Sequence, residues 1–391
     1  RVQPPDGNHL EESGGDGGMK WEIAKLGKIA IIRTGKLDSN AAVIGGRYPF
    51  FTCDPNTLSI DVWAYDTEAV LLAGNNASGN YTAKYYKGKF NAYQRTYIIE
   101  SADEEKLNIR YFCYALNQQL RLLKTMSSGS TTKFLTVRML DNLDIPLPSI
   151  NIQTEIVNIL SAYDDLIENN QKQIKLLEEA AQRLYKEWFV DWRFPGHENT
   201  KIVDGVPEGW NEKTLSQVAN VIMGQSPKSE FYNSEKKGLP FHQGVGSYGV
   251  RFVMDDIYST SYTRIAEPNS ILFSVRAPVG RLNITKNKVV IGRGLAAINQ
   301  TDGCQSYLYY LLKNRFFKDN IVGNGSIFAS VSKDELLNQK FLIPERNLMM
   351  QFEKIVSQMD KQIENLDSKN KKLIEARDRL LPKLMSGEVE V

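Results

Sequence analysis

Two long stretches of the chain share one pattern of apolar and polar positions. Alternating steps of four and three residues meet mainly apolar side chains over Ile156–Trp188, where Asn170 is the polar exception. The same steps over Phe352–Leu384 meet apolar side chains except at Asn370 and Arg377. An apolar residue every ~3.5 positions is typical of a coiled-coil seam. The pattern therefore predicts two long helices, each ~50 Å in length at about 1.5 Å per residue.

We expect the two helices to pair in antiparallel orientation, because each follows a globular segment and a parallel pair would crowd these segments at one end. Full overlap places Ile156 opposite Leu384 and Asn170 opposite Asn370. A buried Asn that faces an aliphatic side chain would lose ~1–3 kcal/mol in hydrogen bonding, whereas two facing Asn side chains can satisfy each other. We therefore predict that Asn170 and Asn370 fix the register. In the alternative, both side chains simply contact water.

The segments that precede the two helices also repeat. The stretch WEIAKLGKIAIIRTGK begins at Trp21, and WNEKTLSQVANVIMGQ begins 189 residues later at Trp210. Further on, Ser127–Ser149 matches Gly323–Glu345 at an offset of 196 residues, which holds to the end of the chain. Two matched ends in the same order indicate an internal duplication. Short apolar runs broken by Gly and Pro, mixed with helical stretches, predict an α+β fold for both copies.

The predicted organisation is two globular α+β domains separated by a long two-helix antiparallel coiled coil, with pseudo-twofold symmetry. The polar, Gly-rich start reads as a disordered leader or a cloning remnant, with Met19 as the natural start. Within the second domain, Ser332 and Glu335 have the spacing of a helix capping box. The predicted parts are the leader 1–19, the first domain 20–150, the first helix 151–192, a linker 193–209, the second domain 210–345 and the second helix 346–391.

Composition narrows the class without identifying a ligand. The 391 residues are enough for two or three domains, and the net charge of +2 does not by itself indicate a nucleic-acid partner. The cysteines Cys53, Cys113 and Cys304 are too scattered for a disulfide framework or a zinc site. No apolar run reaches the ~18–20 residues of a membrane helix, and no signal peptide is visible. We expect a protein of a reducing cytoplasm.

Local charge gives a sharper indication. The windows Ala69–Ile99 and Pro268–Thr301 contain no Asp or Glu but several Lys and Arg, and the Gly-rich run His242–Arg251 precedes the second window. Acid-free windows let phosphates approach, and Arg, Asn and Gln can read base edges with paired hydrogen bonds. A twofold protein with two such heads suits duplex DNA. The alternative is a solvated basic loop over ordinary Tyr packing.

From these windows we select seventeen candidate DNA-binding residues. They are Asn75, Asn76, Lys84, Tyr85, Lys87, Lys89, Asn91, Tyr93, Gln94, Arg95, His242, Gln243, Tyr248, Arg251, Arg276, Arg281 and Arg293.

Catalytic motifs are missing from the sequence. It contains no GxxxxGK[ST] phosphate loop, no HExxH and no amino-methyltransferase signature, and its three His are dispersed. Asp103–Lys106 could suggest a nuclease carboxylate pair, but a solvated turn is the simpler reading. Trp188–Phe194 could contact a partner or pack at the junction of helix and domain. We therefore predict that the chain has no catalytic or metal-binding residues. A stand-alone nuclease and a structural adaptor for proteins remain as rival interpretations.

The sequences of the two long helices, and their positions after the globular domains, resemble those of a known family. The stretch PSINIQTEIVNILSAYDDLIENNQKQIKLLEEAAQRLYKEWF (Pro148–Phe189) and its degenerate copy PERNLMMQFEKIVSQMDKQIENL (Pro344–Leu366) each follow a globular domain. This order is similar to that of the DNA-specificity subunit of type I restriction–modification systems. The runs YPFFTCD, LLAGNN and YYKGKFNAYQRTY are similar to parts of that family's target-recognition domains. The likeness covers about residues 20–391.

The resemblance implies a division of labour. Each target-recognition domain would read one half of a split DNA sequence, and the helix pair would set the unspecified gap. Two modification subunits would methylate adenine with S-adenosylmethionine, and restriction subunits would use ATP and Mg²⁺ to translocate and cut DNA. The specificity subunit itself would bind no cofactor and carry out no chemistry. By their place in the family pattern, the partner-binding candidates are Leu177, Leu184, Trp188, Leu373, Leu380 and Leu384.

Overall fold

The computed structural model describes residues 21–75, 81, 83–126, 135–316 and 330–391, so the predicted leader lies outside it. The described chain forms two compact units. The first unit comprises residues up to Asn169 together with Lys369–Val391, and the second comprises Asn170–Ser368. None of the described helices is long and apolar enough to span a membrane.

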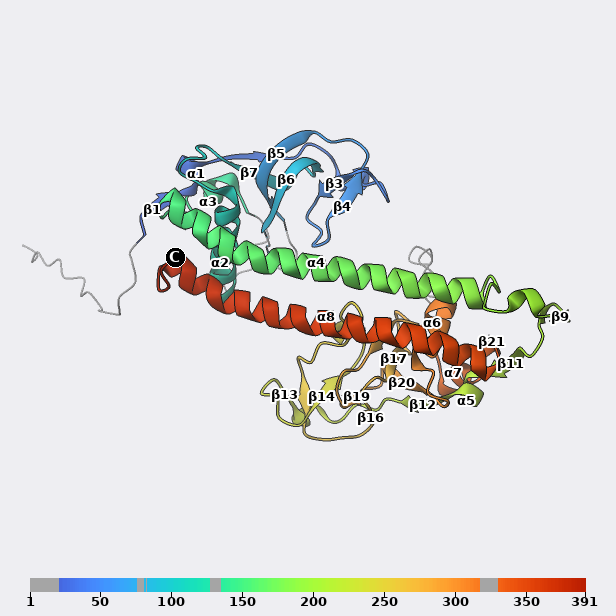
Figure 1. The fold of residues 1–391 in the computed structure, drawn as a ribbon. Coiled ribbons are helices and arrows are strands. Elements are labelled where there is room, and N and C mark those ends of the chain that lie inside the picture. The colour runs from blue at the N-terminus through green and yellow to red at the C-terminus, as the bar shows by residue number, and fades with distance from the viewer. Residues whose placement is uncertain (1–20, 76–80, 82, 127–134, 317–329) are drawn as a thin grey trace, which may run out of the picture. The chain divides into compact units, whose positions relative to one another are not determined.

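The first unit contains a six-stranded sheet with the strand order β2-β7-β5-β6-β3-β4. Helix α2 packs on one face of this sheet (Figure 1). Neighbouring strands are antiparallel except β3 and β6, which run parallel with Phe50 beside Asn91. The elements are β1 (Ile23–Lys25), α1 (Leu26–Ile29), β2 (Ala30–Thr34), η1 (Ser39–Ala41), β3 (Tyr48–Phe51), β4 (Leu58–Ile60), β5 (Tyr65–Ala73), β6 (Ala83–Ala92), β7 (Thr96–Ser101), α2 (Ile109–Met126), α3 (Val137–Asp141) and β8 (Asp144–Pro146).

The apolar run in β5 explains how both faces of this sheet are covered. Successive side chains of a strand point to opposite faces. Val70 and Leu72 therefore join the core beneath α2, whereas Leu71 packs with Phe51 and Phe90 on the other face.

The second unit has a four-stranded sheet, β12-β20-β17-β18, and a five-stranded sheet, β13-β15-β14-β19-β16. Ile271 and Phe273 of β17 pack with α6, and the alternate residue Leu272 faces a second cluster. The elements are η2 (His197–Asn199), β9 (Ile202–Val203), β10 (Val206–Pro207), β11 (Asn211–Thr214), α5 (Leu215–Val218), β12 (Ala219–Met223), η3 (Ser229–Phe231), β13 (Tyr232–Asn233), β14 (Leu239–His242), η4 (Val245–Ser247), β15 (Tyr258–Ser259), β16 (Ile265–Ala266), β17 (Ile271–Ser274), β18 (Leu282–Ile284), β19 (Val289–Ile291), β20 (Leu295–Gln300), α6 (Gln305–Phe316), α7 (Lys333–Leu337) and β21 (Lys340–Ile343).

The two units repeat one strand arrangement, as the sequence duplication predicts. Strand β7 lies between β2 and β5 in the first unit, and β20 lies between β12 and β17 in the second. The parallel pair β3–β6 has its counterpart in β14–β19, where Phe241 lies beside Val290. The capping box at Ser332 and Glu335 is confirmed at the start of α7. Both domains are mixed α and β structures.

The two long helices are α4 (Ile150–Phe189) and α8 (Arg346–Ser386), and each contributes residues to both units. They end earlier than predicted. Gly387, with φ of 73°, adopts the left-handed conformation that ends many helices. Shortly after α4, Trp192 has a φ of 57°, which takes the chain out of the helical conformation.

The seam residues pack inside each unit. Ile156, Leu160 and Leu384 belong to the core of the first unit. In the second unit, the rings of Trp188 and Phe352 are 6.0 Å apart between centroids, as expected for the predicted register. Pairing of α4 and α8 along their whole length stays a prediction.

The two Asn residues of the predicted register pair are both buried, with 5% exposure for Asn170 and 6% for Asn370. Asn370 Nδ2 donates a hydrogen bond of 3.4 Å to the carbonyl of Ile167. The alternative in which both side chains simply contact water is therefore wrong. The direct pairing of Asn170 with Asn370 stays a prediction.

Candidate nucleic-acid interface

One edge of each domain brings three chain segments together at the ends of strands. In the first domain, the amide of Tyr93 donates to the carbonyl of Phe51 at 2.9 Å, and that of Gly74 donates to Arg95 at 2.8 Å. The end of β3, the end of β5 and the turn between β6 and β7 therefore lie side by side. Polar side chains on these segments can act on one ligand.

The second domain builds the same edge with equivalent backbone bonds. The amide of Gly292 donates to the carbonyl of His242 at 2.8 Å, and that of Val275 donates to Gly294 at 2.9 Å. These bonds make position 293 the counterpart of 94, and position 276 that of 75. The edge is thus a repeated backbone frame that carries different side chains in the two domains.

In the first domain, the exposed predicted residues at this edge are Gln94 and Arg95, and Asn75 and Tyr93 beside them are half-buried. Gln94 Nε2 donates to Asp38 Oδ1 at 2.7 Å, which holds the amide at the surface. Asn76 lies outside the described residues. We call Lys36, Asn75, Gln94 and Arg95 the first recognition edge.

In the second domain, Gln243, Arg276 and Arg293 are exposed. Ser226 links two of them, because its hydroxyl donates to Gln243 Oε1 at 2.7 Å and accepts from the Arg293 amide at 3.1 Å. The Gln243 amide nitrogen and the Arg293 guanidinium supply donors for base edges. We call Gln225, Gln243, Arg276 and Arg293 the second recognition edge.

Sequence reasoning missed Lys36 and Gln225, which are exposed at equivalent places. Each follows a glycine that the fold needs: a Cβ on Gly35 would lie 2.2 Å from the Ala92 carbonyl oxygen, and one on Gly224 would lie 2.1 Å from that of Gly292. The close approach brings the next residue against the turn. The signal was available, because both glycines belong to the repeat that begins at Trp21 and Trp210.

Three predicted DNA-binding residues are buried, and we withdraw them as direct contacts. Asn91 is 4% exposed and donates from Nδ2 to the Val62 carbonyl at 3.0 Å. His242 has no exposed surface, and its ring nitrogens contact Ser247 and Asp255. Arg251 is 2% exposed and pairs with acids on both long helices. These side chains cannot reach a base edge in this structure.

Four other predicted residues lie on β6 and contact side chains of the same domain. Tyr85 donates to Glu68 Oε1 at 2.8 Å, and Lys87 pairs with Glu68 Oε2 at 2.8 Å. Burial first, and then the bond to Glu68, raise the pKa of Tyr85 to about 12. Lys84 contacts Thr57 Oγ1 at 3.3 Å, and Lys89 lies 4.7 Å from the ring centroid of Trp63. Contact of these four residues with DNA stays a prediction.

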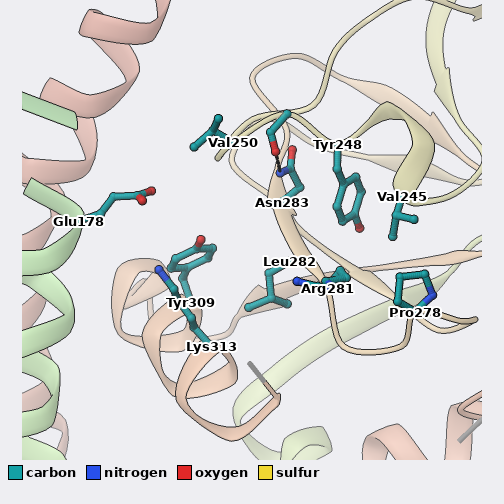
Figure 2. Close-up of a pocket in the computed structure, with 11 residues that line it drawn as sticks. Glu178, Val245, Tyr248, Val250, Pro278, Arg281, Leu282, Asn283, Tyr309 and Lys313 are labelled. Carbon is teal, nitrogen blue, oxygen red and sulfur yellow. Dashed lines mark hydrogen bonds between the residues drawn. The ribbon is translucent and has the colours of Figure 1, made fainter. Parts of the chain in front are cut away.

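The two remaining candidates, Tyr248 and Arg281, line a cavity of about 430 Å³ in the second unit (Figure 2). The Tyr248 hydroxyl donates to the Leu272 carbonyl at 2.9 Å, so this ring is anchored to β17. Burial raises the pKa of Tyr248.

The predicted partner-binding residues pack within the chain. Trp188 is 8% exposed and Leu384 is 1% exposed, so we withdraw both as surface contacts. The other four, Leu177, Leu184, Leu373 and Leu380, are half-buried. Seam positions face the core, because the apolar period that revealed them is the period of the buried face. Leu166 and Leu176 of α4 are 46% and 64% exposed.

Two segments for which the sequence left a functional and a structural interpretation open have structural roles. Asp103 and Lys106 form an exposed ion pair of 3.0 Å in a turn. Trp188, Phe189 and Phe194 pack with Trp210 in the core of the second unit. Among the described residues, no group of three His, Cys, Asp or Glu could hold a metal ion.

Two α+β domains that repeat one strand arrangement and one strand-end edge define a class of internally duplicated proteins. The chain matches the family described as the type I restriction modification DNA specificity domain over residues 19–179 and again over 207–376. It therefore belongs to that family. As a member it is a specificity subunit and not an enzyme by itself, as the sequence predicted.

Individual relatives support this family assignment. The chain is 29% identical over 316 residues to the putative type I restriction enzyme MjaX specificity subunit of Methanocaldococcus jannaschii, which covers 78% of this chain and 74% of the relative. It is 31% identical over 226 residues to the type I restriction enzyme EcoDI specificity subunit of Escherichia coli, covering 52% of this chain and 50% of the relative. The crystal structure of a type I S subunit from M. genitalium shares the fold, with a TM-score of 0.61 and 19% identity over 96% of this chain and 98% of the other.

Proposed function

We propose that each recognition edge reads one half of a split DNA site. The observation that carries this proposal is the repeated edge with unlike side chains: Gln94 in the first domain occupies the position of Arg293 in the second. A Gln amide suits adenine, whereas an Arg guanidinium suits guanine, and each does so through two hydrogen bonds in the major groove. The two half-sites should therefore differ in sequence.

The gap between the half-sites would be set by α4 and α8, paired as an antiparallel coiled coil. This pairing is supported by the contribution of both helices to both units, and by the presence of seam residues from both helices in the core of each unit. Asn170 and Asn370 would face each other and fix that register. A pair of helices of 40 and 41 residues would be ~60 Å long at about 1.5 Å per residue.

Two modification subunits would dock on exposed surfaces of the long helices, such as those of α4 at Leu166 and Leu176, and restriction subunits would join that complex. S-adenosylmethionine, ATP and Mg²⁺ would be bound by those subunits and not by this chain. The assembly would act on double-stranded DNA in the prokaryotic cytoplasm.

A methylation map tests the proposed function. The chain is co-expressed with its modification subunit, and the host DNA is sequenced for modified adenine. Two short specified blocks around a fixed gap would support the proposal. A continuous motif would refute the two-headed arrangement, and no motif from a soluble complex would favour a protein adaptor. DNA binding that is insensitive to salt would also favour the adaptor, because phosphate contacts weaken steeply as salt rises.

A further inference from the structure

Arg251, which the sequence suggested as a DNA contact, instead joins the second domain to both long helices. Its guanidinium donates from Nη1 to Glu178 Oε1 of α4 at 3.3 Å and from Nη2 to Asp360 Oδ1 of α8. Nη1 also donates to the Tyr310 hydroxyl of α6 at 3.1 Å, and the guanidinium lies 4.1 Å from the ring centroid of Tyr309. We call Arg251, Glu178, Asp360 and Tyr310 the arginine clamp.

Half of this clamp is repeated in the first unit. Asp164 and Tyr114 stand 196 residues before Asp360 and Tyr310, and Tyr114 donates directly to Asp164 Oδ2 at 2.5 Å. The cation there is Arg377 of α8, whose Nη1 donates to Asp164 Oδ1 at 2.6 Å. Both units thus place a tyrosine and an acid where a domain helix meets a long helix. In the second unit the arginine comes from the loop that follows β14.

That loop leads directly to the recognition edge. At its start, buried His242 contacts Ser247 and Asp255, which closes the loop beside the exposed Gln243. At Arg251, the carbonyl accepts from the Ile284 amide of β18 at 3.0 Å. Strand β18 pairs with β17, which runs on to Arg276. The backbone of Arg251 is therefore linked to the segments that carry Gln243 and Arg276.

A cavity lies beside the arginine clamp. Tyr248, Gly249 and Val250 of the loop line the cavity of about 430 Å³ together with Glu178 and Tyr309 (Figure 2). Lys286, which pairs with Asp367 at 2.7 Å, provides a second polar link from this domain to α8. These polar contacts add to the apolar packing of Phe252, which belongs to the core of the second unit.

We propose that Arg251 is a positioning residue that fixes the angle of the second recognition edge on the long helices, and thereby sharpens the choice of gap. The proposal rests on the proposed function. A gap wrong by one base pair moves a half-site by ~3.4 Å and turns it by roughly 35°. A domain that is held rigidly on the helices cannot bind the displaced and rotated half-site. A domain released from the clamp can reorient and bind it.

The test compares the wild type with a variant, each in the complete complex with the modification subunits. The quantity measured is the preference for DNA of one gap length. The variant is Arg251→Met with Glu178→Gln and Asp360→Asn, so that no buried charge is left unpaired. Methylation is measured on DNA whose gap is one base pair shorter than, equal to or one longer than that of the wild type. We expect both half-sites to be retained and the preference for the correct gap to fall roughly tenfold, within the usual range of couplings between sites.

The matched control is Lys340→Met with Glu212→Gln, which removes an exposed ion pair of 2.8 Å in the same unit and should leave the preference unchanged. Arg251→Lys keeps the charge but cannot span both acids, and it should give an intermediate preference. An unchanged preference in the triple variant overturns the proposal. So does equal loss of methylation at every gap, because Arg251 would then serve general folding. A wild-type complex without a split motif would refute the proposed function instead.

Discussion

Lengthening both helices by three heptads tests whether they set the gap. Three copies of Gln171–Leu177 are inserted between Asn170 and Gln171, and three copies of Ile363–Lys369 between Lys369 and Asn370. These places are opposite each other in the antiparallel register, and each copy keeps two seam residues. They lie close to the division between the two units, so both cores are retained.

The size of the change follows from helix geometry. Twenty-one added residues lengthen each helix by ~32 Å at about 1.5 Å per residue. One turn of DNA is roughly 34–36 Å and 10–10.5 base pairs, so the second half-site would return to nearly the same face of the duplex. We expect the same two half-sites, separated by nine or ten additional base pairs.

A single inserted heptad is the informative contrast. It adds ~10 Å, or about three base pairs of rise, and three base pairs turn the half-site by roughly 105°. The helix pair does not supply that rotation, so modification should be much weaker than with three heptads. Methylation maps of both variants provide the assay. An unchanged gap after either insertion refutes the ruler, and full modification at a gap three base pairs longer would refute the rotational reasoning.

Three further predictions concern single side chains. Gln94→Ala and Arg293→Ala should each relax only their own half-site, by about 1–3 kcal/mol or 5- to 150-fold, in methylation maps that leave the other block intact. Tyr114→Phe removes the 2.5 Å bond to Asp164 and should lower the free energy of unfolding by ~1.5–3 kcal/mol, seen as a lower urea midpoint without a change of motif. Burial, opposed by the amides of Tyr307 and Ser306, raises the pKa of Glu353. Its ionisation therefore opposes folding, and wild-type stability relative to Glu353→Gln should fall as pH rises from below the ordinary Glu pKa. Equal differences in urea midpoint at pH 4 and pH 7 would contradict this reasoning.

The long helices were predictable because their apolar period is local and runs through many turns. Residues such as Leu160 and Val356 sit in the core for the reason that made them visible in the sequence. The partner-binding candidates Trp188 and Leu384, which the family resemblance indicated, are also seam positions and are buried for the same reason. A residue found by its apolar period is a residue of the buried face, so the exposed docking face needs another signal.

The recognition edge was only partly predictable, because acid-free windows report charge along the chain and not side-chain direction. Gln94 and Arg293, which were selected from these windows, lie on exposed turns. Asn91 lies in the same window but points inward from β6. Arg251 has its acidic partners 73 and 109 residues away, so its local sequence could not reveal that it is paired.

The length of the helix pair and the angle of the domains can be changed separately. Heptad insertion leaves Arg251, Glu178 and Asp360 in place within one unit, and the neutral clamp variant leaves both helices at their natural length. If helix length alone sets the gap, the clamp substitutions would not widen the range of gap lengths that the three-heptad variant methylates. If the angle also matters, the combined variant should accept nine and ten additional base pairs more evenly than the insertion alone, because the freed domain can follow the remaining rotational error. The same methylation assay separates the two cases.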